Sequence, residues 1–314
     1  MKKLLLTTVA VLGAWSPLAP TANAADIIEE PVYVTPPAPT PVVQTSGWYL
    51  RGDIGYNFKS KSDGHWDFYN IIYPGVDDSH RYDELNLKNS ANFGAGVGYR
   101  VNDYFRLDAT ADYFRADAEG RTACPYQIKN DANHGLGGDP DAECNYDDTS
   151  KASIWTIMAN AYVDVGTYGR ITPYIGAGIG AAHVSYSDSS TTENCPECVA
   201  TWVPYEGTHP GLSSWRFASS LMAGASVDIT EQLKFDAGYK YTRISGGKAF
   251  GFDSEDTAYG ASGTQMEDNG FNIHTVRAGL RYEFGGSSFG KGKEPAPLYT
   301  AQDTVYAEPA PIYK

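Results

Sequence analysis

Four cysteines are the residues of this chain best suited to covalent chemistry. Cys124 and Cys144 lie in one polar segment, and Cys195 and Cys198 form a Cys-x-x-Cys motif in the next. In an exported chain, four cysteines most simply form two disulfides, one within each segment, although three pairings can be drawn. The alternatives for Cys-x-x-Cys are a redox centre or half of a metal site. We predict two disulfides, because the chain has no second Cys-x-x-Cys pair.

Alternating oxygen-bearing side chains raise the question of a calcium site. They are Asp139, Asp141, Glu143, Asn145 and Asp147. A calcium loop of the usual kind needs glycine at its sixth position and an acid at its twelfth, and neither is present. We therefore predict a solvated acidic loop, no bound metal and no cofactor.

His183 and Ser185 form the one pairing that suggests catalysis. A histidine can activate a serine for acyl transfer, and residues two apart share one face of a strand. No carboxylate partner for His183 can be identified in the sequence. The prediction is therefore a histidine at a membrane interface, with no catalytic residues.

The first residues indicate export. Lys2 and Lys3 precede an apolar run to about residue 19, and Ala22-Asn23-Ala24 fits a cleavage site. Residues 1–24 are thus predicted to be a signal peptide, and the mature chain to begin at Ala25-Asp26. No later stretch approaches 18 consecutive apolar residues, so a membrane-spanning form of this chain must be a β-barrel.

Eight segments alternate apolar and polar residues with a period of two, which is typical of strands. In the last, His274, Val276, Ala278, Leu280, Tyr282 and Phe284 oppose Thr275, Arg277, Gly279, Arg281 and Glu283. The others lie at 48–58, 93–100, 105–113, 155–164, 175–180, 215–228 and 233–241. Short turns at 101–103, 165–170 and 229–232 alternate with polar segments at 59–90, 116–150, 187–213 and 245–270. This rhythm favours an eight-stranded antiparallel transmembrane β-barrel with four long extracellular loops over a secreted sandwich.

The polar faces of these strands carry both signs of charge. A lumen of eight strands is narrow enough to be packed by side chains, and buried charges must pair. We therefore predict a filled lumen with an ion-pair network. Its predicted members are Arg51, Asp53, Arg106, Asp108, Asp112, Arg216, Asp236, Arg277, Arg281 and Glu283. A small charge-selective channel is the alternative, which would need one sign in excess.

Three motifs resemble those of a known family. Gly279, Leu280, Tyr282 and Phe284 match the Gly-apolar-x-aromatic-x-Phe signal of bacterial outer-membrane barrels. Segments 47–56 and 172–180 resemble the opacity-like and OmpA-like eight-stranded antigens of alphaproteobacteria. The resemblance covers 47–284 and implies recognition by the barrel assembly machinery, contact with outer-membrane lipids and lipopolysaccharide, and a structural, antigenic or adhesive role. The His-x-Ser pair resembles that of lipid A deacylases, so a lipid A-modifying enzyme is the alternative.

Two proline-rich tails flank the predicted barrel, at 25–46 and 285–314. Glu294-Pro295-Ala296-Pro297-Leu298-Tyr299 is echoed by Glu308-Pro309-Ala310-Pro311-Ile312-Tyr313. Such segments are usually extended spacers. The repeat also suggests recognition by a periplasmic protein, and Ala25-Asp26 suggests attachment to peptidoglycan.

Composition supports the same reading. The net charge of −14 argues against a nucleic-acid partner, and 23 Tyr and 33 Gly suit a barrel. The predicted function is an integral protein of the bacterial outer membrane that contributes to envelope integrity and to surface contact or adhesion through its loops.

Overall fold

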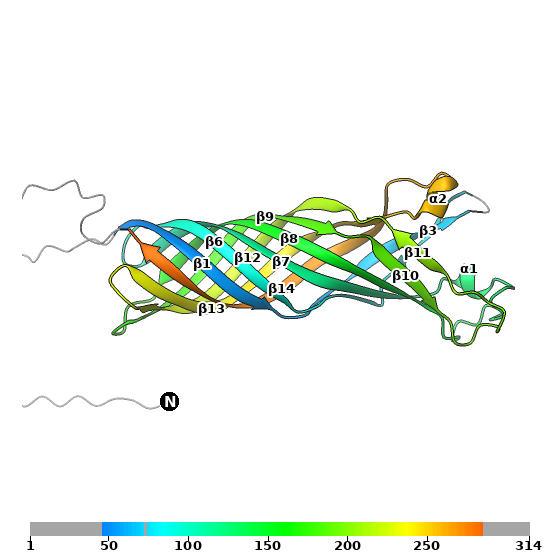
Figure 1. The fold of residues 1–314 in the computed structure, drawn as a ribbon, viewed down its shortest axis with the longest axis horizontal. Helices are drawn as coiled ribbons and strands as arrows, with labels where there is room; N and C mark the ends of the chain where they lie inside the picture. Colours follow the sequence, from blue (N-terminus) through cyan, green and yellow to red (C-terminus); the bar gives the residue numbers. More distant parts are fainter. Residues whose placement is uncertain (1–45, 72–73, 285–314) are drawn as a thin grey trace, which may run out of the picture. The chain divides into compact units, whose positions relative to one another are not determined.

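The fold is one antiparallel sheet whose main strands pair in a ring. The computed structural model describes residues 46–71 and 74–284. In pairing order the ring contains β1 (Gly47–Asn57), β6 (Ser90–Arg100), β7 (Phe105–Ala123), β8 (Asn145–Asp164), β9 (Ile171–Tyr186), β12 (Ser213–Asp228), β13 (Leu233–Gly251) and β14 (Thr264–Glu283). β14 pairs again with β1 (Figure 1). The predicted all-β antiparallel class is confirmed. Among the described residues, no helix is both long and apolar enough to cross a membrane.

The two faces of the ring differ in the way that the alternation predicts. In β1, Leu50 and Ile54 are exposed on the outer face, whereas Arg51 and Asp53 are buried on the inner face. Large apolar side chains are exposed in the other strands too, for example Phe93, Ile157, Ile175, Phe217 and Leu280. Charge inside and apolar groups outside is the reverse of a soluble protein, and it leaves an outer surface suited to lipid.

Much of the sequence that we predicted to be polar loop is regular structure. The described residues contain fourteen strands instead of the eight predicted, because these segments also form β2 (Ser60–Ser62), β3 (Gly64–Asn70), β4 (Gly75–Arg81), β5 (Glu84–Leu87), β10 (Ser189–Asn194) and β11 (Glu206–His209). Two short helices accompany them, α1 (Tyr126–Lys129) and α2 (Ser254–Ala258). β7, β8, β13 and β14 each run for 19 or 20 residues. β2, β10 and β11 have no apolar side chains on either face, so no hydrophobic period marks them as strands.

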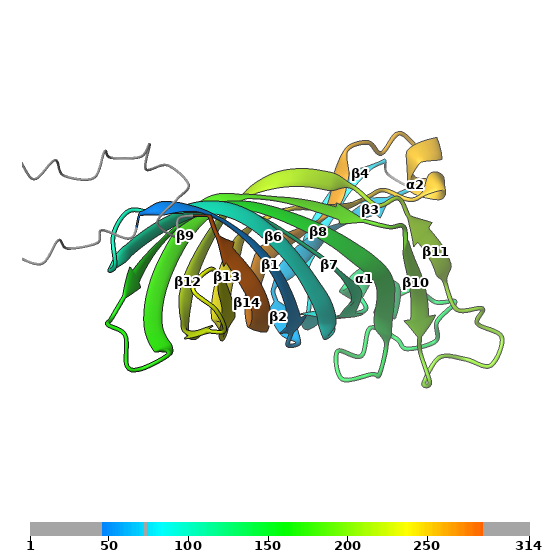
Figure 2. The same cartoon turned by 60° about the vertical axis from the view of Figure 1, so that its left-hand side comes forward.

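The additional elements gather at one end of the ring. Figures 1 and 2 show α1, α2, β3, β4, β10 and β11 at the end opposite the short turns; we call it the loop end. Inside the ring near this end, Phe114, Ile154 and Phe271 form an apolar core. Trp66 of β3 and Leu87 of β5 pack against it, which explains why these strands stay attached to the ring.

Candidate functional site

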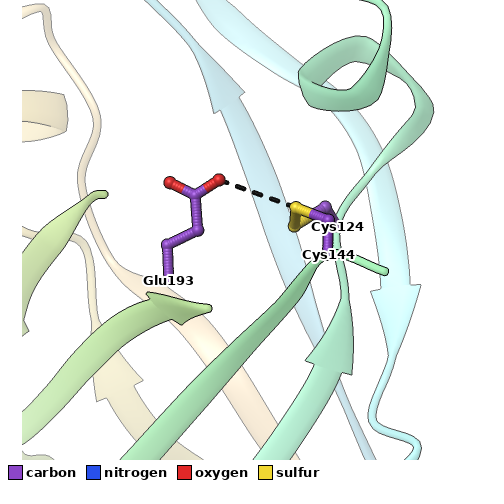
Figure 3. Close-up of side chains that lie close together, drawn as sticks. All are labelled: Cys124, Cys144 and Glu193. Carbon is purple, nitrogen blue, oxygen red and sulfur yellow. Dashed lines mark hydrogen bonds between the residues drawn. A yellow bond between two sulfur atoms is a disulfide. The ribbon is translucent and has the colours of Figure 1, made fainter. Parts of the chain in front are cut away.

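The cysteines lie at the loop end in two disulfides. Cys124 is bonded to Cys144, and Cys195 to Cys198. Glu193 Oε1 lies 3.6 Å from Cys144 Sγ (Figure 3). A disulfide sulfur has no hydrogen to donate and no thiolate to bind a metal, so this is a contact rather than a metal site. His134, Glu193 and Cys198 also come together. Cys198 is in a disulfide as well, so this group is not a metal site either.

Glu193 is a buried carboxylate that joins two long segments. It is 3% exposed. Its Oε2 accepts hydrogen bonds from Trp202 Nε1 at 3.2 Å and from the Tyr205 backbone N–H at 3.0 Å. Its Oε1 lies 3.1 Å from His134 Nε2, whose ring lies 3.6 Å, centroid to centroid, from the Trp202 ring. Sequence reasoning missed this residue, because it occurs in a polar run with no motif.

Removing the Cys124–Cys144 bridge should loosen the segment between its ends. On a chain-entropy model this bridge, which closes a separation of 20 residues, contributes about 3 kcal/mol. We expect the Cys124→Ala/Cys144→Ala variant to be cleaved within 125–143 far faster than the parent in limited proteolysis. The Cys195→Ala/Cys198→Ala variant is the matched control, because that bridge spans only three positions. Equal cleavage rates in the two variants would contradict the prediction.

A cavity of about 390 Å³ lies between the loop-end elements. Aromatic side chains form much of its wall: Trp66, Phe68, Tyr69, Tyr146 and Tyr205. These come from β3, β8 and the segment before β11, and β14 adds Gln265 and Met266. All four segments predicted as loops therefore meet at one site. Because these residues are far apart in the sequence, no local sequence motif could have predicted the cavity.

Every formally charged side chain that lines the cavity, in the described part of the chain, is acidic. The acids are Asp131, Asp148, Asp253, Glu255 and Asp256. Burial and the neighbouring charges of Asp253 and Glu255 raise the pKa of Asp256 to about 6. Burial also raises the pKa of Asp148. The cavity is therefore a region of negative potential, and among the described residues that line it only the side chain of His209 can take up a positive charge.

Two buried polar atoms of residues that line the cavity have no hydrogen-bond partner within the described part of the chain. They are His209 Nδ1 and Gln265 Oε1. Both residues are 4% exposed and line the cavity. Gln265 Nε2 donates to the Asp67 backbone oxygen at 3.2 Å and to Asp256 Oδ2 at 3.4 Å, which leaves its oxygen as a free acceptor.

The alternating acids of the second polar segment do not converge on a common point. Asp139 Oδ1 accepts from the Asp141 backbone N–H at 2.9 Å, and Asp147 pairs with Arg121 at 2.6 Å. The Glu143 backbone N–H donates to Glu197 at 3.2 Å. The Asp139 and Asp147 oxygens are therefore committed to separate contacts.

His183 and Ser185 lie on β9 without a mutual hydrogen bond among the described residues. The His183 ring is 5.0 Å from the ring of Trp215 on the neighbouring strand. Tryptophan is enriched where a barrel meets the membrane–water interface, so this neighbour agrees with a histidine at that interface.

Nine of the ten charges predicted for the lumen are buried on the inner face, Glu283 is half-buried, and six of the ten pair with one another. The pairs are Arg51 with Asp53 at 2.8 Å and with Asp108 at 3.1 Å, Arg106 with Asp164 at 2.8 Å, Lys240 with Asp112 at 2.7 Å, and Arg281 with Asp236 at 3.1 Å and with Glu283 at 3.0 Å. Asp164 and Lys240, the partners of Arg106 and Asp112, are not in the predicted network. Two further members of the predicted set behave differently. Arg216 pairs with Asp268 at 2.6 Å, in a segment predicted to be a loop, and Arg277 Nη2 contacts Met222 Sδ at 3.6 Å.

The residues of the predicted assembly signal lie at the end of β14. Leu280, Tyr282 and Phe284 are exposed on the outer face. A Cβ at Gly279 would collide with the Asp53 carboxylate, so glycine leaves room for that buried charge. The predicted signal peptide, Ala25-Asp26 and both tails lie outside the described residues.

Comparison with known proteins gives consistent matches. The model of a family described as outer membrane protein beta-barrel domain matches residues 34–284. A Brucella melitensis protein is 54% identical over 84% of this chain and 93% of its own length. A putative adhesin of Rickettsia bellii is 27% identical over 75% of this chain and 87% of its own length. An opacity protein of Neisseria gonorrhoeae is 26% identical over 60% of this chain and 76% of its own length.

Proposed function

Because the chain belongs to the family of outer membrane protein β-barrel domains, we propose that it is a surface-contact protein of the outer membrane whose loop end faces outward. Its outer-membrane location and its likeness to opacity proteins agree with the prediction from sequence. Relatives named as adhesin and opacity protein favour a non-enzymatic role.

The observation that carries the proposal is the continuation of the sheet beyond the exposed apolar side chains. β7 pairs with β8 as far as Ala123 and Asn145, where the Cys124–Cys144 disulfide follows. An ordered, cross-linked structure at the loop end offers a fixed surface for binding, which disordered loops would not. In this proposal eight strands span the membrane, and the loop end projects from it.

We further propose that the lumen is filled and does not conduct. The paired charges of the inner face and the apolar core above them support this. In planar bilayers the purified protein should show no conductance of porin size. Steady channels of that size would overturn this part of the proposal and favour the channel alternative.

Adhesion by intact cells tests the proposed role. The chain is expressed in a non-adherent Gram-negative strain, and binding to host epithelial cells is compared with that of a variant whose residues 125–143 and 196–204 are replaced by Gly-Ser linkers. We expect the variant to lose most of the binding at equal surface amount. A Gly-Ser replacement of the opposite turn, 166–169, is the control and should bind like the parent. Equal adhesion by all three chains, or by cells lacking the protein, would dismiss the role.

The proposed contribution to envelope integrity has a separate readout. Deletion of the protein from its own bacterium should increase sensitivity to detergent, and the loop-end variant should restore resistance as well as the parent does. A deletion strain with unchanged sensitivity would remove this part of the proposal.

A further inference from the structure

The loop-end cavity has the size of a small-molecule site. About 390 Å³ is within the range of roughly 300–1,000 Å³ that is typical of ligand pockets. Of the residues that line it, Trp66 and Met266 are buried, whereas Asp131 and Glu255 are exposed. The lining therefore combines buried apolar side chains with exposed acids.

Its aromatic rings are arranged to present both faces and edges. The Trp66 and Tyr146 rings are 6.1 Å apart and nearly perpendicular, and the Tyr146 and Tyr205 rings are also 6.1 Å apart and perpendicular. These edge-to-face contacts hold the three rings together as one wall of the cavity. The negative faces of such rings attract an organic cation, whose apolar part they also cover.

The charges select the sign of the guest. Asp253 accepts hydrogen bonds from the Asp256 backbone N–H and from the Tyr205 hydroxyl, yet it has no cationic partner among the described residues, and neither has Asp256. Burial, together with the neighbouring charges of Asp253 and Glu255, raises the pKa of Asp256, so the carboxylates here lie in mutual repulsion. A bound cation would relieve this repulsion, and an anion would increase it.

Two unpartnered acceptor atoms lie buried in the wall of the cavity. Gln265 Oε1 lacks a donor, and His209 Nδ1 can accept when the ring is protonated at Nε2. A metal ion would instead need several ligand atoms at close range. Within the described residues, the cavity's acids are absent from the groups whose ligand atoms converge within 4.8 Å.

We propose that the loop-end cavity binds an organic cation, an ammonium or guanidinium group joined to an apolar segment. The aromatic wall covers the apolar segment of the guest, and the carboxylates neutralise its charge. The source is either a free small molecule or a lysine or arginine side chain of a protein at the contacted surface. The inference rests on the proposed function in one respect only, that the loop end with its cavity faces the outside of the cell.

Binding to the purified full-length protein in detergent micelles tests this by calorimetry. The cationic probes are choline and the blocked tripeptide Gly-Arg-Gly; the neutral probes are the same tripeptide with citrulline and methyl galactoside. We expect a cationic probe to bind and both neutral probes to fail. Binding of choline alone identifies a small-molecule source, and binding of the arginine peptide alone identifies a side chain. Both results sustain the proposal.

Charge-matched variants connect the binding to this cavity. Asp256→Asn should weaken the cationic probe about tenfold, because one carboxylate near the cation is lost. Asp139→Asn removes the same charge at the loop end but outside the cavity lining, and it should leave affinity unchanged. Equal weakening by the two variants, preference for the sugar, or no binding of either cation would overturn the proposal. Adhesion of intact cells is measured separately, so failure of the cavity and failure of surface contact give different results.

Discussion

Replacing Asp164 with leucine should lower the free energy of unfolding by about 3–5 kcal/mol, because it leaves Arg106 charged and unpaired on the inner face. Arg106 is 1% exposed and Asp164 is 2% exposed. Two guanidinium nitrogens of Arg106 bond the carboxylate, Nε at 2.8 Å and Nη2 at 2.8 Å. Both side chains are buried from solvent, so water does not readily replace the lost carboxylate.

Replacing both partners should be less harmful than replacing one. The carbon attached to the three Arg106 nitrogens lies 5.0 Å from the centre of the Tyr162 ring and 5.2 Å from that of Tyr174. A methionine can pack in the same place. The Arg106→Met/Asp164→Leu variant should therefore recover much of the loss, since it buries no lone charge. Urea unfolding in detergent micelles of the parent, both single variants and the double variant measures this non-additivity.

A surface pair provides the control for this cycle. Lys88 and Glu119 also form an ion pair, but their side chains are 49% and 46% exposed. Water and salt screen such a pair, so Lys88→Met should have little effect on stability. If Asp164→Leu were equally mild, or if the Arg106 and Asp164 effects simply added, the ion pair would not be what stabilises this part of the inner face.

The sequence predicts those strands in which apolar and polar residues alternate from one position to the next. Leu50 and Ile54 on the outer face and Arg51 and Asp53 on the inner face are of this kind, so strand location and facing could be predicted. In β10 the buried residues are Ser189, Thr191 and Glu193, and their exposed neighbours are also polar. Hydrophobic periodicity cannot predict such a strand, although buried and exposed residues alternate along its whole length.

The partners of the site residues could not be predicted for a different reason. Gln265 bonds the Asp67 backbone, 198 positions away, and Arg216 bonds Asp268, 52 positions away. These contacts depend on the register of the strands between them, which the alternation alone does not set. The partners of the cysteines were easier to predict, because four cysteines allow only three sets of disulfide pairs.

Replacing Glu193 with alanine should destabilise the loop end by about 3 kcal/mol while leaving the rest of the ring folded. The Trp202 Nε1–H and the Tyr205 N–H would lose their shared acceptor, and His134 would lose its carboxylate partner. Tyr205 also lines the cavity, so the wall of the cavity should loosen as well. Hydrogen exchange should show faster exchange at the Tyr205 and Val199 amides, the latter bonded to the His134 oxygen at 3.0 Å.

Two further variants separate the hydrogen bonds of Glu193 from its charge. Glu193→Gln keeps an oxygen for Trp202 and Tyr205, and its amide can donate to His134 in the other tautomer, so exchange should rise much less than in Glu193→Ala. Glu197→Ala removes an exposed carboxylate from the same segment and should leave the Tyr205 amide protected. If Glu193→Gln exchanged as fast as Glu193→Ala, the charge and not the hydrogen-bond geometry would hold the two segments together. If the Tyr205 amide also exchanged that fast in Glu197→Ala, Glu193 would have no special role in stabilising the loop end.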